Sequence, residues 1–478
     1  MKTTTRAWLL TLLAVLLSVT AAAQNQNKQI ATEFEKRVKD YVKLREDIEA
    51  KMPKLSKEAR AEEIAVHKKQ LQESVRAARA GAKHGDIFTP EAAALVRATI
   101  KDQFKGKDRV ELLKTVLVES EVKALPLRVN YPYPETKEQL EMPPPLLLRL
   151  PQLPKQIRYR FVGDDMLLVD RENGLILDYM TGALPPITNA TAQQLASKPV
   201  TTSAPVAAAR TAPGTLLLPN KESSVRFVVI GDTGTGTNKQ HELADVLLRY
   251  RQMFPFEFVL MMGDNMYGSE QAVDYKTKFE DVYRPLLDQK VKFYAALGNH
   301  DDSNQRFYQY FNMEGQEYYH FKKGNVSFYS LNSNYMDKKQ VDWLNEKLAA
   351  DTAEWKIAYF HHPPYSSGGA HGSDSKLREI VEPIFLKNGV NVVFSGHEHF
   401  YERIKPQQGV YYFISGSGGK LRKGDVKKDS PLMEKAFDQD LSFMLIEVAG
   451  DRMYFQVISR TGETVDQGVI VRPANGRG

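Results

Sequence analysis

Side chains suited to metal binding or proton transfer follow a series of apolar segments. The runs VRFVVIGD, FEFVLMMGD and VKFYAALGNHD each end in glycine followed by aspartate or asparagine, whereas WKIAYFHHPP and VNVVFSGHEH end in histidines. The polar side chains at these ends are Asp232, Asp264, Tyr267, Asn299, His300, His361, His362, His397 and His399. Carboxylates, an amide oxygen, imidazoles and a phenol suit iron, manganese or zinc better than copper(I). The set therefore predicts a metal centre.

The number of donors indicates two ions rather than one. Taken singly, an aspartate after a strand is usually a turn former or helix cap, and a lone histidine is more often structural. Together the donors exceed what one ion needs, so two ions that share a carboxylate are the economical arrangement. The motif GHEH agrees with this, because His397 and His399 alternate along an extended segment and each can serve a different ion.

The segments between these donors predict the scaffold. Helical patterns lie at about 238–252 and 270–288, and SKLREIVEPIFLKNG separates the two histidine-ended runs. A repeated strand, polar tip and helix predicts an α/β domain with its polar residues along one sheet edge, where ligands bind in such folds. The later run GVYYFISGSGG predicts another strand that enters a glycine-rich turn, and LSFMLIEVAG, RMYFQVISR and GVIVRP predict strands that complete a second sheet.

The N-terminal half has a different pattern of apolar and charged residues. Apolar residues recur at spacings of three, four and seven between charges over about 28–122, which predicts helices packed as a bundle; a partner-binding face is the alternative. Thr89 and Pro90 predict an N-cap and first helical position. The predicted domains are a helical domain at 24–125, a small proline-rich and β unit at 126–185, a flexible linker at 186–223 and the catalytic domain at 224–474.

The first residues predict a cleavable secretory signal over 1–23. Lys2 and Arg6 form a basic region, an apolar stretch follows, and Ala21 to Ala23 suit cleavage; a retained anchor is the alternative. The chain has no cysteine, which excludes disulfides, thiolate ligands and a lipid-modified N-terminal cysteine. Its formal charge of +6 becomes +4 without Lys2 and Arg6, a mild bias that indicates no nucleic-acid binding. We therefore expect a periplasmic or secreted protein without a membrane span after cleavage.

The series GDTG, GDNMY, GNHD, HHPP and GHEHFYER resembles the calcineurin-like metallophosphoesterases, and most closely the purple acid phosphatases. All five blocks occur in order between Val225 and Pro473. Most of the wider superfamily has Asp-x-His in the first block, whereas here Asp232 is followed by Thr233 and Gly234, so that the imidazole is absent. Purple acid phosphatases replace the missing imidazole with a tyrosine three residues after the bridging aspartate, which is the position of Tyr267. The resemblance implies two sheets packed face to face and flanked by helices.

The resemblance also implies a ligand set and two substrate-facing histidines. A ferric site would consist of Asp232, Asp264, Tyr267 and His399, and a divalent site for iron, zinc or manganese would consist of Asp264, Asn299, His362 and His397. His362 is chosen over His361 from the position of the following prolines, so that His361 is expected behind the site. His300 and His371 match histidines that bind phosphate oxygens or protonate the leaving group.

The sequence thus predicts an exported, dinuclear, metal-dependent phosphatase that hydrolyses phosphomonoesters by attack of metal-bound hydroxide. A phosphodiesterase or nucleotidase on the same scaffold is an alternative, because loops rather than metal ligands select the substrate. A non-catalytic envelope protein with a vestigial metal site is the alternative from another class. The expected partner is a small phosphate ester, and the sequence identifies no partner for the N-terminal helices.

Overall fold

The computed structural model describes residues 3–103, 126–133, 140–141, 150–184, 214–268 and 270–472. The chain divides into two compact units. The N-terminal unit comprises Met1–Met52 and Lys69–Lys198, and the C-terminal unit comprises Pro53–Lys68 and Pro199–Gly478. A short piece of the predicted helical domain is therefore grouped with the C-terminal residues. The predicted domain boundaries remain predictions.

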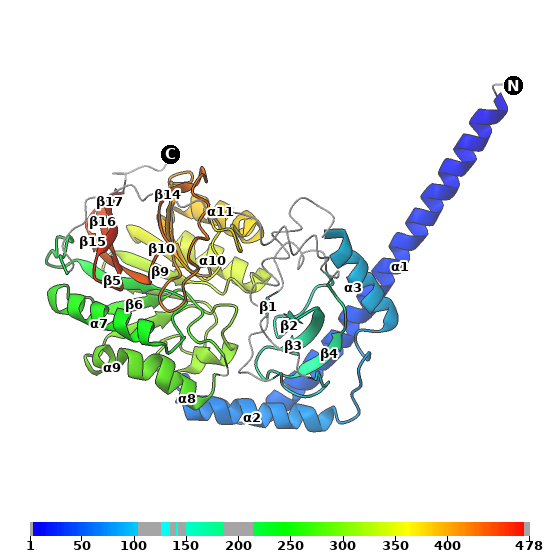
Figure 1. Cartoon of the computed structure of the whole chain (residues 1–478), viewed down its shortest axis with the longest axis horizontal. Helices are drawn as coiled ribbons and strands as arrows, with labels where there is room; N and C mark the ends of the chain where they lie inside the picture. Colours follow the sequence, from blue (N-terminus) through cyan, green and yellow to red (C-terminus); the bar gives the residue numbers. More distant parts are fainter. Residues whose placement is uncertain are drawn as a thin grey trace. The chain divides into compact units, whose positions relative to one another are not determined.

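The N-terminal unit combines helices and a small antiparallel sheet (Figure 1). Its helices are α1 (Thr3–Glu49), α2 (Ala61–Ala78, of which Lys69 onward lies in this unit) and α3 (Pro90–Gln103), and its strands are β1 (Leu140–Glu141), β2 (Ile157–Val162), β3 (Asp165–Asp170) and β4 (Ile176–Met180). Phe34, Val75 and Val96 from the helices share one core with Phe161 and Leu168 from the sheet. The amphipathic stripe is thus buried by internal packing. Thr89 caps α3 by accepting a hydrogen bond from the Ala92 N–H.

The C-terminal unit contains two mixed sheets. One has the strand order β17-β16-β15-β5-β6-β7, and the other has the order β14-β12-β13-β11-β10-β9-β8. The first consists of β5 (Val225–Ile230), β6 (Phe258–Met261), β7 (Lys292–Ala295), β15 (Ser442–Ala449), β16 (Arg452–Ser459) and β17 (Thr464–Val471). The second consists of β8 (Tyr319–Lys323), β9 (Val326–Ser330), β10 (Trp355–Tyr359), β11 (Val392–Ser395), β12 (Tyr401–Ile404), β13 (Tyr411–Ser415) and β14 (Met433–Phe437).

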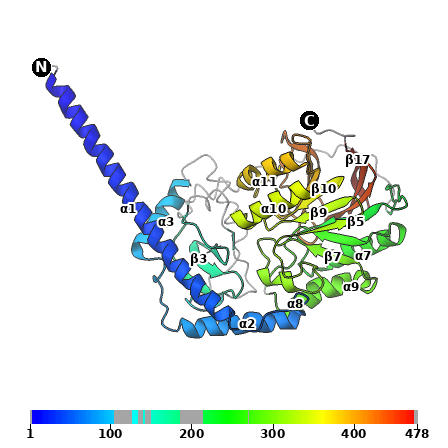
Figure 2. The ribbon, with the colours of Figure 1, turned by 180° about the vertical axis from the view of Figure 1, so that it is seen from behind.

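Helices cover the outer face of each sheet, which gives four layers (Figures 1 and 2). On the outer face of the first sheet pack α7 (Asn238–Met253), α8 (Ala272–Tyr275), a π-helical turn (Lys276–Glu280) and α9 (Asp281–Asp288). On that of the second pack α10 (Lys338–Ala350) and α11 (Ser375–Asn388). Alternation along β5 explains the layering: Val228 packs toward α7, whereas Phe227 packs against Phe328 and Phe394 of the other sheet.

This architecture confirms the predicted α/β fold with two sheets flanked by helices. It corrects the expectation that the polar tips lie along one sheet edge, because β5 to β7 belong to one sheet and β10 and β11 to the other. The last three predicted strands, β15 to β17, do not complete a second sheet, because β15 pairs with β5 in the first. The two sheets stack face to face, so their strand ends still converge. Most of the predicted linker, residues 186–213, lies outside the described residues, as do the side chains of the predicted signal. No described helix is long and apolar enough to cross a membrane.

Candidate metal centre

The carboxyl ends of five strands deliver the candidate ligands. Asp232, Asp264 and Asn299 follow β5, β6 and β7, which are parallel neighbours. His361 and His397 follow β10 and β11, a parallel pair in the second sheet. Parallel strands bring their carboxyl ends to a common edge, and here two such edges meet.

Three of the candidate ligands have left-handed backbone conformations. The φ angles are 56° at Asp232, 50° at Asp264 and 69° at His397. Non-glycine residues seldom adopt this region, and such strain of about 1–3 kcal/mol concentrates at functional sites. The sharp turn after each strand directs these side chains inward. The residue before His397 must also lack a side chain, because a Cβ at Gly396 would lie 2.5 Å from Oδ2 of Asp232.

One group of donors surrounds the Tyr267 phenol. Its oxygen donates a hydrogen bond to Oδ1 of Asp232 at 3.2 Å and lies 3.4 Å from Nε2 of His399. Nε2 of His399 in turn lies 3.5 Å from the same carboxylate oxygen. A phenol, a carboxylate and an imidazole from three separate blocks thus converge on one point. Together with Asp264 they are the residues expected at the ferric site.

A second group of donors surrounds Nδ1 of His397. This atom lies 3.1 Å from Oδ1 of Asn299 and 3.1 Å from Nε2 of His361. Nε2 of His361 is also 3.4 Å from Oδ1 of Asp264. Ligand atoms of Asp232, Asp264 and His361 lie within 4.8 Å of one another, as do those of His361, His362 and His397. Asp264 therefore borders both donor groups, as expected of a bridging carboxylate.

His361 has the more central position of the adjacent histidines, although the sequence interpretation placed it behind the site. Its Nδ1 lies 2.9 Å from the carbonyl oxygen of Met262. Because a carbonyl only accepts, Nδ1 carries the proton and Nε2 presents its lone pair to Asp264 and His397. His362 pairs its Nδ1 with Oγ of Ser333 at 2.9 Å. The structure therefore adds His361 to the candidate ligands beside His362.

The two predicted substrate-facing histidines lie beside different donor groups, His300 beside Tyr267 and His371 beside His397. The His300 ring is 4.9 Å from the Tyr267 ring, and the His371 ring is 4.2 Å from the His397 ring, measured between centroids. The backbone N–H of His300 donates to Oδ1 of Asp264 at 3.0 Å. Contacts between neighbours thus connect every residue that the sequence assigned to the site.

The sequence did not identify the groups that support these residues. Glu398, between the two GHEH histidines, is fully buried and accepts hydrogen bonds from Gly372 N–H at 2.6 Å and Ser366 O–H at 3.2 Å. It thereby anchors the loop that carries His371. Lys420 lies over the Tyr267 ring, with its Nζ 3.9 Å from the ring centroid. Lys420 is the first residue of the basic run KLRKGDVKK, which follows the strand β13 and its glycine-rich turn.

Burial sets the protonation of the imidazoles. Burial lowers the pKa of His361 to about 3, and burial also holds the pKa values of His397 and His399 well below their usual range. These rings are therefore neutral near pH 7 and can offer lone pairs. Burial, followed by the charge of Asp264, raises the pKa of Asp232 well above its usual range. Burial, followed by the charges of Asp264 and Asp232, raises the pKa of Tyr267 well above its usual range.

The donor set fits metal cations. Two buried carboxylates, a buried phenol and neutral imidazoles form a group whose anionic forms require positive charge nearby. A divalent or trivalent ion supplies that charge and reverses the upward pKa shifts of the acids. The oxygen and nitrogen donors suit iron, zinc or manganese. Neighbouring groups also hold the donors in position: the Met262 carbonyl accepts a hydrogen bond from His361 and so orients its ring.

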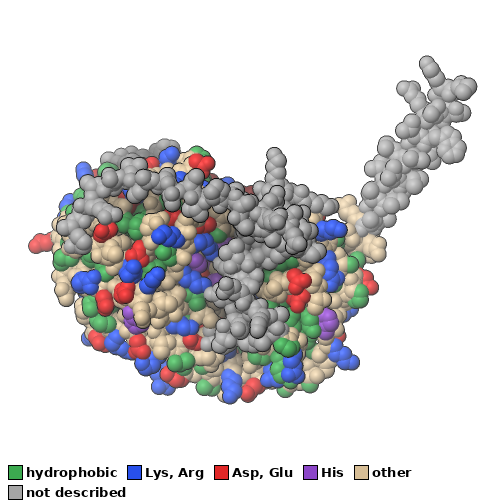
Figure 3. Space-filling model, viewed as in Figure 1, with side chains coloured by type: hydrophobic (Ala, Val, Ile, Leu, Met, Phe, Trp, Pro, Cys, Tyr) green, Lys and Arg blue, Asp and Glu red, His purple; other side chains and the backbone are tan. Residues whose placement is uncertain are grey.

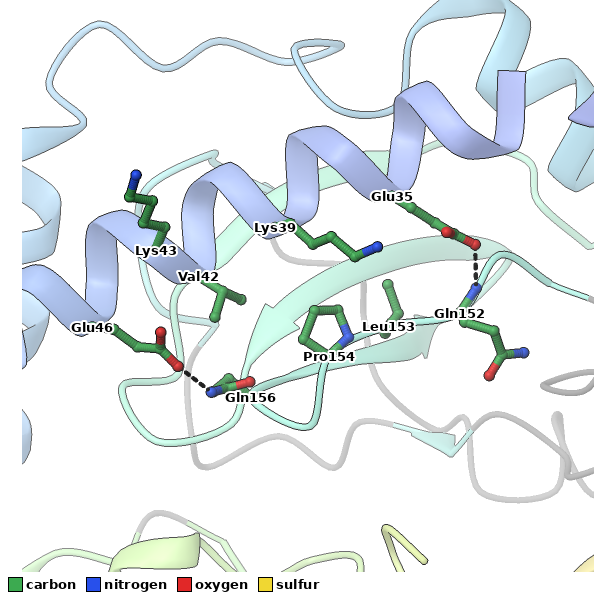
Figure 4. Close-up of a pocket in the computed structure, with 9 residues that line it drawn as sticks. All are labelled: Glu35, Lys39, Val42, Lys43, Glu46, Gln152, Leu153, Pro154 and Gln156. Atoms are coloured by element: carbon green, nitrogen blue, oxygen red, sulfur yellow. Dashed lines mark hydrogen bonds between the residues drawn. The ribbon is translucent and has the colours of Figure 1, made fainter. Parts of the chain in front are cut away.

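The N-terminal unit contains a separate, shallow pocket of about 480 Å³ between α1 and the segment before β2 (Figure 4). Gln152 N–H donates to Glu35, and the Gln156 side chain donates to Glu46 across it. None of the predicted site residues lines this pocket. Among the residues that the structure describes, acidic and basic side chains are interspersed on the face shown in Figure 3.

Comparison with known proteins identifies the class. Residues 225–401 match the calcineurin-like phosphoesterase family. Purple acid phosphatase 17 of Arabidopsis thaliana is 27% identical over 243 residues, which cover 43% of this chain and 71% of that protein. Human (Homo sapiens) tartrate-resistant acid phosphatase type 5 is 28% identical over 250 residues, covering 42% and 77%. A purple acid phosphatase from yellow lupin (Lupinus luteus) seeds has a similar structure with a TM-score of 0.46 and 16% identity, covering 68% and 61%.

Residues 225–401 of the C-terminal unit are thus similar to the calcineurin-like phosphoesterase family, and the relatives in this comparison support a metallophosphoesterase. Within that family, the chain is similar to the purple acid phosphatases. The family match begins at residue 225, and the matches to the two acid phosphatases cover less than half of this chain.

Proposed function

We propose that the chain is an exported, dinuclear phosphatase that hydrolyses phosphomonoesters. One observation carries the proposal: two donor groups, around Tyr267 and around His397, share Asp264 at the ends of parallel strands. The first group would hold iron(III) and the second a divalent iron, zinc or manganese ion. When bound, two such ions supply Lewis acidity toward phosphoryl oxygens and lower the pKa of water.

The chain's own residues would divide the remaining work. Asp232, Asp264, Tyr267 and His399 would hold one ion, and Asp264, Asn299, His361 or His362, and His397 would hold the other. His300 lies beside the first group and His371 beside the second, so a phosphoryl group seated between them meets an imidazole on each side. Either ring can donate a hydrogen bond to a phosphoryl oxygen or a proton to the leaving group.

Export is proposed from the first 23 residues alone. A basic start, an apolar stretch and alanines at 21–23 are typical of a signal that is cleaved during secretion. A phosphatase in the periplasm or outside the cell would act on esters that do not enter the cytoplasm. Sequencing the N-terminus of protein recovered from cell fractions tests this proposal: a start near residue 24 supports it, and an intact Met1 contradicts it.

The catalytic proposal is tested by metal content and turnover on matched esters. We expect about two bound metal ions per chain and faster hydrolysis of p-nitrophenyl phosphate than of bis(p-nitrophenyl) phosphate. Asp264→Asn should lose metal and reduce kcat/KM by about a hundredfold or more. Asp245→Asn, on the exposed face of α7, is the control and should behave as wild type.

Faster diester turnover would favour the alternative, a phosphodiesterase or nucleotidase. A wild-type protein that binds metal but hydrolyses neither ester, nor a panel of nucleotides, would contradict the catalytic proposal and favour a binding role.

A further inference from the structure

A segment from the N-terminal half is part of the unit that carries the metal centre. Residues Pro53–Lys68 group with the C-terminal unit although the family match begins at residue 225. The Ala59 N–H donates to the Phe307 carbonyl at 2.6 Å, and the Ala59 carbonyl accepts from Gln309 N–H at 3.0 Å. Ala59 and Ile64 are buried in the same core as Tyr308. This segment therefore packs on the stretch that follows the GNHD block.

The segment ends in a largely buried ion pair. Nζ of Lys68 lies 3.3 Å from Oδ2 of Asp302, and the two side chains are only 12% and 6% exposed. Beside them, Oε1 of the buried Glu270 accepts a hydrogen bond from the backbone N–H of Asp302 at 2.6 Å. Two carboxylates thus lie close together in the interior, and the Lys68 ammonium faces them. Burial and the charge of Asp302 raise the pKa of Glu270, whereas Lys68 acts in the opposite direction.

Asp302 is directly connected to the loop that supplies Asn299 and His300. Its Oδ1 caps the short helix Ser303–Phe307 by accepting from Asn304 N–H at 2.9 Å. The preceding residue, Asp301, accepts from Gly298 N–H at 2.7 Å and from Met266 N–H at 3.1 Å. Asp301 therefore fastens the loop to the GDNMY block. Asp302 fastens the same loop to the N-terminal segment through Lys68.

We propose that Lys68 is a positioning residue of the metal centre: by pairing with Asp302 beside the buried Glu270, it holds the loop that presents Asn299 and His300. In this proposal Lys68 acts through Asp302 and not by direct contact with a metal ion or the substrate. Removing one member of a buried charge group leaves the others uncompensated, which is more damaging than losing a surface pair. A shift of the loop by about 1 Å would misplace the groups that act on the phosphoryl oxygen.

The proposal is tested on the full chain by paired lysine variants. Lys68→Met keeps an unbranched side chain but removes the charge, and Lys69→Met, at the exposed next position of α2, is the matched control. Hydrogen exchange measured peptide by peptide reports on the loop without reference to activity. We expect Lys68→Met to speed exchange about fivefold or more over 298–307 and to leave peptides of β5 and β6 unchanged. Lys69→Met should match wild type.

Enzyme kinetics and a compensating variant complete the test. The kinetic measurements rest on the proposed phosphatase function. Lys68→Met should lower kcat for p-nitrophenyl phosphate about tenfold with KM nearly unchanged. Adding Glu270→Gln, which removes one buried charge but keeps the acceptor for the Asp302 N–H, should restore loop protection and turnover. Restoration by the double variant supports the proposal even where Lys68→Met alone does not accumulate as folded protein.

Several outcomes would contradict the proposed positioning role of Lys68. Equal exchange and turnover in the Lys68→Met and Lys69→Met proteins would show that the ion pair does not position the loop. Faster exchange throughout the C-terminal unit, or failure of the double variant to fold, would assign Lys68 to general stability. Should wild type hydrolyse no phosphate ester, the functional proposal fails while loop exchange still decides the role of Lys68.

Discussion

The phenol oxygen of Tyr267 donates a hydrogen bond to Oδ1 of Asp232 across 3.2 Å, although 35 positions separate the two residues. Tyr267 reaches Asp232 because its backbone is tied to the first block: Tyr267 N–H donates to the Gly234 carbonyl at 2.9 Å. Gly234 stands where most of the superfamily has a histidine, two residues after the aspartate, and the phenol of Tyr267 lies beside Asp232 instead. This pairing underlies the proposed ferric site.

Tyr267→Phe should remove the visible absorption band expected of wild type while leaving the protein folded. Phenolate bound to iron(III) absorbs in the visible range, and phenylalanine keeps the ring packing but lacks the oxygen. The measurement is a visible spectrum with metal analysis after aerobic purification without chelators. Tyr250→Phe, a buried tyrosine on α7, is the control and should stay coloured. A colourless wild type containing zinc or manganese would exclude the ferric assignment.

Substitution of each adjacent histidine should show which one holds the second ion. Nε2 of His361 faces His397 and Asp264, whereas Nδ1 of His362 bonds to Ser333. We therefore expect His361→Ala to lose one ion per chain and about a hundredfold of activity. His362→Ala should retain more metal and more activity. The measurement is metal stoichiometry after dialysis, and the reverse order would restore the assignment made from the sequence.

The sequence predicted the scaffold well because glycine-plus-donor signals follow each central strand. Asp232 and Asp264 could be recognised because an acidic residue after a buried strand repeats at successive positions. The prediction of two ions that share a carboxylate followed from counting donors, whereas the bridging role of Asp264 was carried over from the resemblance to purple acid phosphatases. The association of β10 and β11 with a different sheet from β5 was not visible locally, because strand pairing depends on the whole chain.

Two features of the C-terminal unit could not be predicted from local sequence patterns. Neighbouring residues on an extended segment point in opposite directions, so the sequence alone does not decide between His361 and His362. Here the Met262 carbonyl, 99 positions away, fixes the His361 ring. Nothing in the spacing of Ala59 and Ile64 indicates that they belong to a core whose other buried members, apart from Ala61, begin at Leu218.

Glu402→Gln should alter the pH dependence of stability. Burial raises the pKa of Glu402, and its Oε2 accepts the Ser367 N–H at 2.9 Å. A raised folded-state pKa favours folding below the unfolded value of about 4.5, and this contribution is lost as pH rises through the folded value. Glutamine keeps the acceptor and never ionises. The variant should therefore gain stability relative to wild type as pH rises, by about 1.4 kcal/mol for each unit of pKa difference.

Urea unfolding of metal-free protein at pH 4 and pH 7 measures this effect. Glu346→Gln, on the exposed face of α10, is the control and should show no such gain. An equal effect of Glu402→Gln at both pH values would mean that the carboxyl group is ionised to the same extent in folded and unfolded chains.

Gly368→Ala should disturb the His371 loop without removing the metals. A Cβ at this position would lie 2.2 Å from Oε1 of Glu398, the atom that accepts the Gly372 N–H. The loop must therefore move away from Glu398, and His371 with it. We expect kcat for p-nitrophenyl phosphate to fall about tenfold at unchanged metal content. Gly81→Ala, where a Cβ meets nothing within 4 Å, is the control. Wild-type turnover by Gly368→Ala would show that the position of His371 does not limit the reaction, whereas metal loss would instead place Glu398 in support of the adjacent ligands His397 and His399.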